Sequence, residues 1–168
     1  MKNKLIKLGA LALLLCGLSF KSYTQEVFKR RNVHVELLGS GIFGSVNYDF
    51  LFKPGNDGFG MRVGLGYLPN GFVLPVGIYD LIGQKRVQFE YGLGIAAAGF
   101  FGPISQDLTF SDGIDNFGII AYGKAGMRIS PQENGLVFNI HWNPLINNQG
   151  FITAWFGLGI GYSWKKKL

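Results

Sequence analysis

The sequence predicts an all-β protein: an eight-stranded antiparallel up-and-down transmembrane β-barrel that follows an N-terminal signal peptide. Three observations support this prediction. Apolar residues alternate with small or polar ones through most of the 168-residue chain, which indicates strands. The composition is 48% hydrophobic and only 15% charged, with 26 glycines. Short segments rich in Asn, Gly and Pro separate the alternating stretches, as hairpin turns do.

Residues 1–24 have the pattern of a secretory signal peptide. Three lysines precede an apolar run at 8–20, which is too short for a comfortable transmembrane helix. The small residues Ser22 and Thr24 permit cleavage before Gln25. Cleavage would remove four lysines and no acidic residue, so the formal net charge would fall from +6 to +2. We therefore expect no nucleic-acid partner.

The single cysteine, Cys16, lies inside this leader. If the leader is cleaved, the mature domain at 25–168 has neither disulfide nor thiol chemistry. The alternative is that Cys16 carries a lipid anchor. The bulky Leu15 before it and the continuing apolar run after it favour cleavage before Gln25.

The first four strands are expected near residues 32–39, 43–53, 58–68 and 72–82. The third and fourth are joined by an Asn-Gly pair, which is the strongest short hairpin signal. The first boundary, at Gly39–Gly41, is either a turn or a kink. A kink would leave seven strands, an odd number that bacterial single-chain barrels avoid.

The last four strands are expected near residues 87–99, 116–129, 135–144 and 151–164. In the last of these, apolar residues occupy every second position and glycines stand among the residues between them. Turn-forming residues separate each strand from the next. The whole mature chain therefore reads as one domain.

The two faces of these strands predict which side meets lipid, because a membrane barrel has its apolar side chains outside and a soluble barrel has them inside. One face is polar and suits a narrow lumen; it carries His34, Glu36, Asn47, Asp49, Arg62, Gln88, Glu90, Lys124, Arg128, Asn139 and His141. The other face is aliphatic in its middle and aromatic at both ends, with Phe52, Phe59, Phe89, Tyr162 and Trp164 toward one rim and Tyr67, Phe72, Phe117 and Trp142 toward the other. A soluble β-sandwich is the alternative.

Six charged residues on the inner face are expected to form an ionic network. Their signs balance, with Glu36, Asp49 and Glu90 against Arg62, Lys124 and Arg128. The interior of an eight-stranded barrel is just wide enough for side chains to fill, and buried charges are stable when they are paired and hydrogen-bonded. Asp49 and Arg62 flank one hairpin, so they are expected to face each other near its periplasmic end. Such a network would stabilise the barrel and block ion flow.

The longest connection, at 100–115, is expected on the outer side of the membrane, with both termini periplasmic. The basic runs at 29–31 and 165–167 would then lie at the opposite rim. The composition of the long connection suits an exposed segment that contacts a partner. The expected contact residues are Phe100, Phe101, Asp107, Phe110, Asp112 and Asp115.

Several segments together resemble the small outer-membrane β-barrel proteins of the Bacteroidetes type. They are residues 35–41 (VELLGSG), 45–49 (SVNYD), 74–76 (LPV), 81–83 (LIG), 89–94 (FEYGLG) and 159–164 (GIGYSW). The resemblance covers nearly the whole mature chain and implies an architecture, and the family brings no known catalytic residues. One departure is the C-terminus, because such barrels usually end on an aromatic residue, whereas here Trp164 is followed by Lys165–Leu168.

Two other patterns were weighed for binding chemistry. Residues 39–44 match the dinucleotide fingerprint G-x-G-x-x-G, but a strand pattern follows where the fingerprint needs a helix. No cofactor is therefore expected. His34, Glu36 and His141 could be metal ligands or an acid/base set. Two histidines on separate strands with one carboxylate fit hydrogen-bonded lumen groups better, so no metal site is expected.

The sequence thus predicts an integral outer-membrane barrel of a Gram-negative bacterium, with a structural or interaction role and no catalytic residues. The expected partners are outer-membrane lipid, lipopolysaccharide and the barrel-assembly machinery. One alternative is a lipid-modifying barrel enzyme such as a lipid A-directed hydrolase, for which Ser111 with Asp112 lies in the outer connection. The other alternative is a small transport or ligand-binding barrel.

Overall fold

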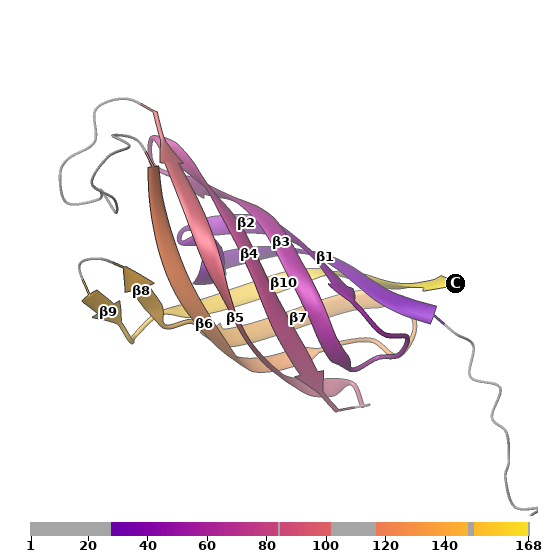
Figure 1. Ribbon diagram of the computed structural model, residues 1–168. Coiled ribbons are helices and arrows are strands. Elements are labelled where there is room, and N and C mark those ends of the chain that lie inside the picture. The colour runs from indigo at the N-terminus through magenta and orange to yellow at the C-terminus, as the bar shows by residue number, and fades with distance from the viewer. Residues whose placement is uncertain (1–27, 84, 102–116, 148–149, 168) are drawn as a thin grey trace, which may run out of the picture.

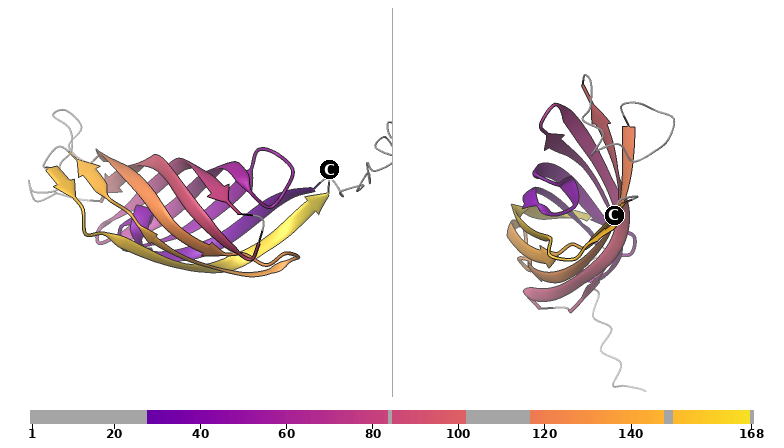
Figure 2. Two further views of the ribbon diagram at one scale, coloured as in Figure 1. Left: turned by 90° about the horizontal axis from the view of Figure 1, so that it is seen from below. Right: turned by 90° about the vertical axis from the view of Figure 1, so that its left-hand side faces the viewer.

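The computed structural model describes residues 28–83, 85–101, 117–147 and 150–167. Its strands wrap into a closed antiparallel barrel of eight strands (Figures 1 and 2). Closure is complete because the first wall strand pairs with the last. The wall strands are β1 (Phe28–Leu38), β2 (Gly44–Leu51), β3 (Gly58–Leu68), β4 (Gly71–Ile82), β5 (Val87–Phe100), β6 (Phe117–Ile129), β7 (Gly135–Trp142) and β10 (Phe156–Lys167).

Each wall strand pairs with its neighbours in the chain, which confirms the predicted up-and-down barrel. Through most of the wall the strands place polar and small residues inside and large apolar residues outside, as the alternation predicted. On β3, for example, the Arg62 side chain is 2% exposed and the Leu65 side chain is 58% exposed. No helix among the described residues is long and apolar enough to cross a membrane.

The two ends of the barrel are built differently. The strand termini Phe28 and Lys167 are paired at one end, together with the turns after β2, β4 and β6. At the other end, the turn between β1 and β2 is a short 3-10 segment, η1 (Gly39–Gly41), whose residues are all buried. The boundary at Gly39–Gly41 is therefore a turn, and the barrel keeps its even number of strands.

The turn η1 has an unusual backbone. Leu38 and Ile42, which flank it, have φ values of 59° and 66°, in the left-handed region that side chains with a Cβ atom disfavour. The Leu38 N–H donates to Phe43 O at 2.9 Å, and the Ile42 N–H donates to Gly39 O at 3.2 Å. The turn contacts β3, β4 and β10 as well as its own strands, so it folds into the barrel rather than away from it.

The expected strand near 151–164 is interrupted between Ile152 and Phe156, and the strand expected near 135–144 ends at Trp142. The wall strand β7 ends at Trp142, and a small hairpin of β8 (Leu145–Asn147) and β9 (Gly150–Ile152) follows before β10 begins. This hairpin projects beyond the barrel at the end opposite the C-terminus (Figure 1). Pro144 contributes to the break, since it has no N–H to donate to a ladder; its carbonyl accepts from the Gly123 N–H of β6 at 2.9 Å.

Candidate functional site: an ionic lumen

The centre of the lumen is a pairing of Asp49 on β2 with Arg62 on β3. The two residues are direct partners in the strand register, because they stand at equal distances from the same hairpin turn. Arg62 donates from Nε to Asp49 Oδ1 at 2.7 Å and from an Nη atom to Asp49 Oδ2 at 2.8 Å. This two-point geometry matches the planar guanidinium to the carboxylate and fixes both side chains.

Glu90 on β5 and Arg128 on β6 join this pair and complete a four-residue cluster across the lumen. Glu90 accepts from Arg62 at 3.1 Å and from Arg128 Nε at 2.7 Å. Arg128 also donates to Asp49 Oδ2 at 2.6 Å. Each carboxylate therefore meets two guanidinium groups, and each guanidinium group meets two carboxylates.

Glu36 on β1 and Lys124 on β6 form a second layer toward η1. Lys124 Nζ lies 3.4 Å from a carboxylate oxygen of Glu36 and 3.4 Å from one of Glu90, so it connects the two layers. Glu36 also accepts a hydrogen bond from Ser40 Oγ of the inward turn at 3.0 Å. The structure therefore brings together all six residues of the predicted network, and all six are buried.

Both histidines lie against carboxylates of the central cluster. His141 Nε2 is 3.0 Å from Glu90 Oε2, and His34 Nδ1 is 3.7 Å from Asp49 Oδ2. They stand on separate strands and face different carboxylates. Among the described residues, no group of three or more His, Cys, Asp and Glu could hold a metal ion. The histidines are thus part of the ionic lumen, beyond the six residues predicted for it.

Tyr79 on β4 supports the central cluster from one side. The guanidinium carbons of Arg62 and Arg128 lie 5.8 and 5.1 Å from the centre of its ring, within cation-π range. The ring occupies space that a glycine leaves free, since a Cβ atom at Gly60 would stand 2.6 Å from the Tyr79 ring. The glycines that the sequence places on the inner face therefore make room for large side chains.

Arg30 closes the lumen at the terminal end, and the sequence analysis placed it at the rim within a basic run. Its side chain is 4% exposed and points inward. It donates to Asn56 Oδ1, to Ser163 Oγ at 2.9 Å and to the Gln132 carbonyl at 3.0 Å. These partners come from two turns and from β10, so Arg30 joins segments far apart in the chain. The inward register of Arg30, two residues before Asn32 and four before His34, was the signal that could have identified it.

The opposite end of the lumen is apolar, which the sequence analysis did not predict. Its buried cluster consists of Leu68, Val73, Ala96, Ala98, Ile120, Tyr122 and Leu145, with Ile42, Phe100 and Trp155 packed against it. Trp155 Nε1 donates to the Gly39 carbonyl at 2.9 Å, which ties the segment before β10 to η1. The lumen is therefore closed at this end by apolar packing and by the inward turn.

The lumen retains little free volume beside the cluster. A void bordered by Arg62, Tyr122 and Lys124 measures about 10 Å³, which is about the size of one water molecule. Chemically, the arrangement holds its carboxylates in multiple ion pairs and offers neither an activated nucleophile nor a free base among the six predicted residues.

The predicted contact residues of the outer connection are only partly described. Phe101 is 70% exposed, and its ring centre lies 5.8 Å from that of Phe72. Phe100 is half-buried and packs against the apolar cluster. The remaining predicted contacts, and the serine weighed as a nucleophile, lie outside the described residues: Asp107, Phe110, Asp112, Asp115 and Ser111. The predicted signal peptide at 1–24 also lies outside them.

Comparison with known proteins supports the fold. No protein-family model matches the chain, and a comparison with curated proteins gave no match. Among solved structures, the chain is similar to the N-terminal β-barrel domain of Pseudomonas aeruginosa OprF, with a TM-score of 0.54 and 12% sequence identity. The similarity covers 83% of this chain and 98% of the OprF domain. At this identity the likeness shows the barrel fold.

Proposed function

We propose that the protein is an integral outer-membrane β-barrel of a Gram-negative bacterium, with a structural or interaction role and a lumen sealed by its ionic network. The observation that supports this most strongly is the inverted polarity of the barrel. Arg62, Glu90 and their partners are buried inside, while large apolar side chains are exposed around the wall. A protein in water would bury the second set. In a bilayer, lipid covers the apolar side chains of the wall while the charged side chains stay paired inside.

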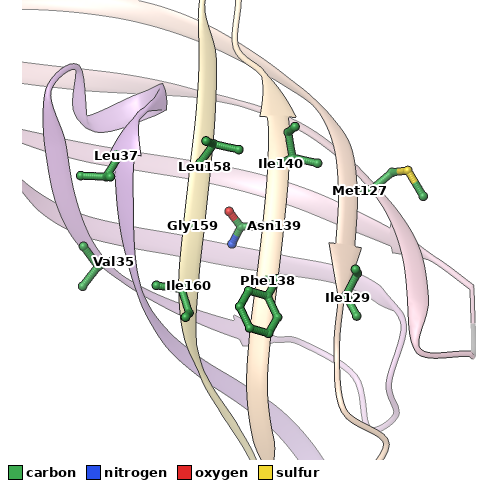
Figure 3. Close-up of a pocket in the computed structure, with 10 residues that line it drawn as sticks. All are labelled: Val35, Leu37, Met127, Ile129, Phe138, Asn139, Ile140, Leu158, Gly159 and Ile160. Carbon is green, nitrogen blue, oxygen red and sulfur yellow. The ribbon is translucent and has the colours of Figure 1, made fainter.

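The outer wall over β6, β7, β10 and β1 illustrates the surface that lipid would cover. Figure 3 shows neighbouring strands presenting aliphatic and aromatic side chains outward around a shallow hollow of about 550 Å³. The side chains include Val35, Leu37, Met127, Ile129, Phe138, Ile140, Leu158 and Ile160. None of these outward groups can form a strong hydrogen bond to water, so the surface fits the acyl chains of a bilayer.

The closed lumen supports the structural role. Ion pairs occupy its centre, Arg30 and its partners close the terminal end, and apolar packing closes the opposite end. An open pore would need a continuous polar path through the lumen. Polar contacts of Arg30 block this path at one end, and apolar packing blocks it at the other. The external segments at the end opposite the termini would then contact partners. Outer-membrane lipid and lipopolysaccharide would surround the wall, and the barrel-assembly machinery would insert the protein.

Cell fractionation combined with heat modifiability tests the membrane assignment. The protein should appear in the outer-membrane fraction and should migrate faster on a gel before boiling than after it, because a closed barrel resists the detergent. Recovery in the soluble fraction, with the same migration before and after boiling, would contradict the proposal. Mass spectrometry of the membrane form should find an N-terminus at Gln25. Lipid attached to Cys16 would contradict this prediction and would show that the protein has a lipid anchor.

Protease treatment of intact cells tests the orientation. The connection between β5 and β6 should be cleaved first, within residues 100–115, because it lies at the end opposite the termini. The turn at 130–134, which lies at the terminal end, should be protected. Cleavage confined to that turn would mean that the barrel is inserted the other way round.

A further inference from the structure

An apolar pocket lies in the mouth of the barrel at the end opposite the termini. Its volume is about 360 Å³, which falls within the range of small-molecule sites. The wall strands contribute Leu68, Ala98 and Ile120, and the segment between β7 and β10 contributes Leu145 and Trp155. The pocket is thus built from wall and mouth segments that come together only in the folded barrel.

The lining of the pocket is predominantly apolar, and Asn147 contributes an amide side chain to it. All of its lining residues are uncharged, and among the described residues no charged side chain lies in the segments 38–44, 66–73, 96–101 or 143–156 that surround this end. The nearest ionic layer, Glu36 with Lys124, lies beyond the apolar cluster and the turn η1. A bound molecule therefore meets mainly hydrocarbon in the pocket, and a charged group that it carries must point out of the mouth.

One wall of the pocket is held in a strained conformation. Ile42, a lining residue, is β-branched and has a φ value of 66°, and such strain persists only where surrounding contacts enforce it. Two hydrogen bonds hold the turn in this shape: Ser40 Oγ donates to Glu36, and Trp155 Nε1 donates to the Gly39 carbonyl. The pocket is therefore shaped before any ligand enters, which lowers the cost of binding.

We propose that this pocket binds the aliphatic chain of a free fatty acid, with the carboxylate at the mouth. A volume near the lower end of the range for ligand sites suits one chain rather than two. The apolar lining and floor match a hydrocarbon and exclude a sugar, a nucleotide or a metal ion. This inference goes beyond the proposed function, since the pocket belongs to the barrel whether or not the barrel has the role proposed above.

Trp155 provides a reporter inside the pocket. Changing the other two tryptophans to phenylalanine (Trp142→Phe, Trp164→Phe) leaves Trp155 as the only source of indole fluorescence. The protein is placed in phosphatidylcholine nanodiscs and titrated with a fatty acid brominated in the middle of its chain, because bromine quenches nearby indoles. Quenching of Trp155 should saturate, and unbrominated fatty acid should reverse it by competition.

Two variants in neighbouring positions identify the site. Ala98→Phe fills the pocket and should abolish the saturable quenching, while Ala97→Phe, on the outer face of the same strand, should leave it intact. A protein that keeps only Trp164, at the opposite end, should show quenching that rises without saturation. The inference is overturned if Trp155 quenching does not saturate, if unbrominated fatty acid does not reverse it, or if brominated phospholipid in the nanodisc quenches Trp155 as strongly. Heat modifiability of each variant reports folding separately, so failure of the barrel is distinguished from failure of the site.

Discussion

The terminal half of the barrel and the opposite half enclose different interiors within one continuous wall. In the terminal half, the lumen is filled by ion pairs among Asp49, Arg62, Glu90 and Arg128. Directional hydrogen bonds between opposite charges hold these side chains in place. In the opposite half the interior is apolar: Leu68, Val73 and Ile120 belong to a buried cluster, and Leu68 and Ile120 also line the mouth pocket. The same strands run through both halves, so the difference comes from their inner-face residues and from η1, Leu145 and Trp155, which are added at the opposite end.

The two interiors respond differently to loss of a side chain. Removing one partner of a buried ion pair leaves an unpaired charge, and this costs more than the lost contact itself. Removing an apolar group leaves a cavity, whose cost depends on how far the surroundings relax. The ionic half should therefore be the more sensitive to single substitutions and the less able to admit a guest molecule.

Arg62→Ala tests the ionic half and should have the largest effect. The substitution leaves Asp49 and Glu90 each short of one guanidinium partner, so the free energy of unfolding should fall by roughly 3 to 5 kcal/mol if the pair is fully desolvated, and by less if water enters. Urea unfolding in lipid vesicles measures the change. The control is Lys166→Ala, an exposed residue near the same end, for which a change within about 0.5 kcal/mol is expected. An Arg62→Ala barrel as stable as the parent would show that the ion pairs of Arg62 do not stabilise the fold.

Gly60→Ala tests the support of the ionic cluster. The added Cβ would stand 2.6 Å from the Tyr79 ring and 2.6 Å from the Phe50 carbonyl oxygen, so the β2 backbone and the ring, with its contacts to both arginines, would be disturbed. Overpacking of this kind costs about 1 to 3 kcal/mol, which the same unfolding assay can detect. Gly44→Ala is the matched control, because its nearest neighbour would be 3.7 Å away, an ordinary contact. Equal stability of the two variants would show that the surroundings of Gly60, including the Tyr79 ring, shift at little cost in free energy.

Trp155→Phe tests the apolar half. The substitution keeps an aromatic ring against the cluster but removes the hydrogen bond to the Gly39 carbonyl, which is worth about 1 kcal/mol. Exchange of the backbone amides at 38–43 should accelerate, because the bond holds the inward turn. Exchange at β4 should stay unchanged. Unaltered exchange around η1 would mean that packing alone holds the turn in place.

The exposed pair of Lys165 and Glu133 should show the smallest effect. The hydrogen bond from Lys165 Nζ, 2.8 Å long, and then its charge hold the pKa of Glu133 below its ordinary value of 4.5. A lowered pKa means that the contribution to stability is present at neutral pH and is lost as the pH falls through the lowered value. Lys165→Gln should return the pKa of Glu133 toward 4.5 in an NMR titration, and Lys166→Gln should not. An unchanged titration in Lys165→Gln would show that solvent screens the pair.

Much of the wall could be predicted from the sequence, because a period of two specifies a strand and its two faces together. The predicted pairing of Asp49 with Arg62 follows from their equal spacing about one turn, and the register confirms it. The ion pair of Arg128 with Glu90, which stand on the neighbouring strands β6 and β5, also follows once the strands are placed in order. These features depend only on local alternation and on antiparallel neighbours.

The ends of the barrel could not be predicted in the same way. Arg30 stands in a run of basic residues that resembles a solvated rim, and only the register turns it inward. The break at Pro144 and the projecting hairpin depend on contacts with β6 that lie outside the local sequence. The apolar mouth combines Leu68 and Ile120 from different strands with Trp155, which no single alternating stretch contains.

Conductance of the parent protein in a planar lipid bilayer tests the central claim most directly. A lumen filled by the pairs of Asp49 and Glu90 with Arg62 and Arg128, and closed by Arg30 at one end and by η1 at the other, leaves no continuous water path. We expect that inserted, heat-modifiable protein conducts no steady current across the bilayer. A large and steady conductance from the unmodified barrel would contradict it.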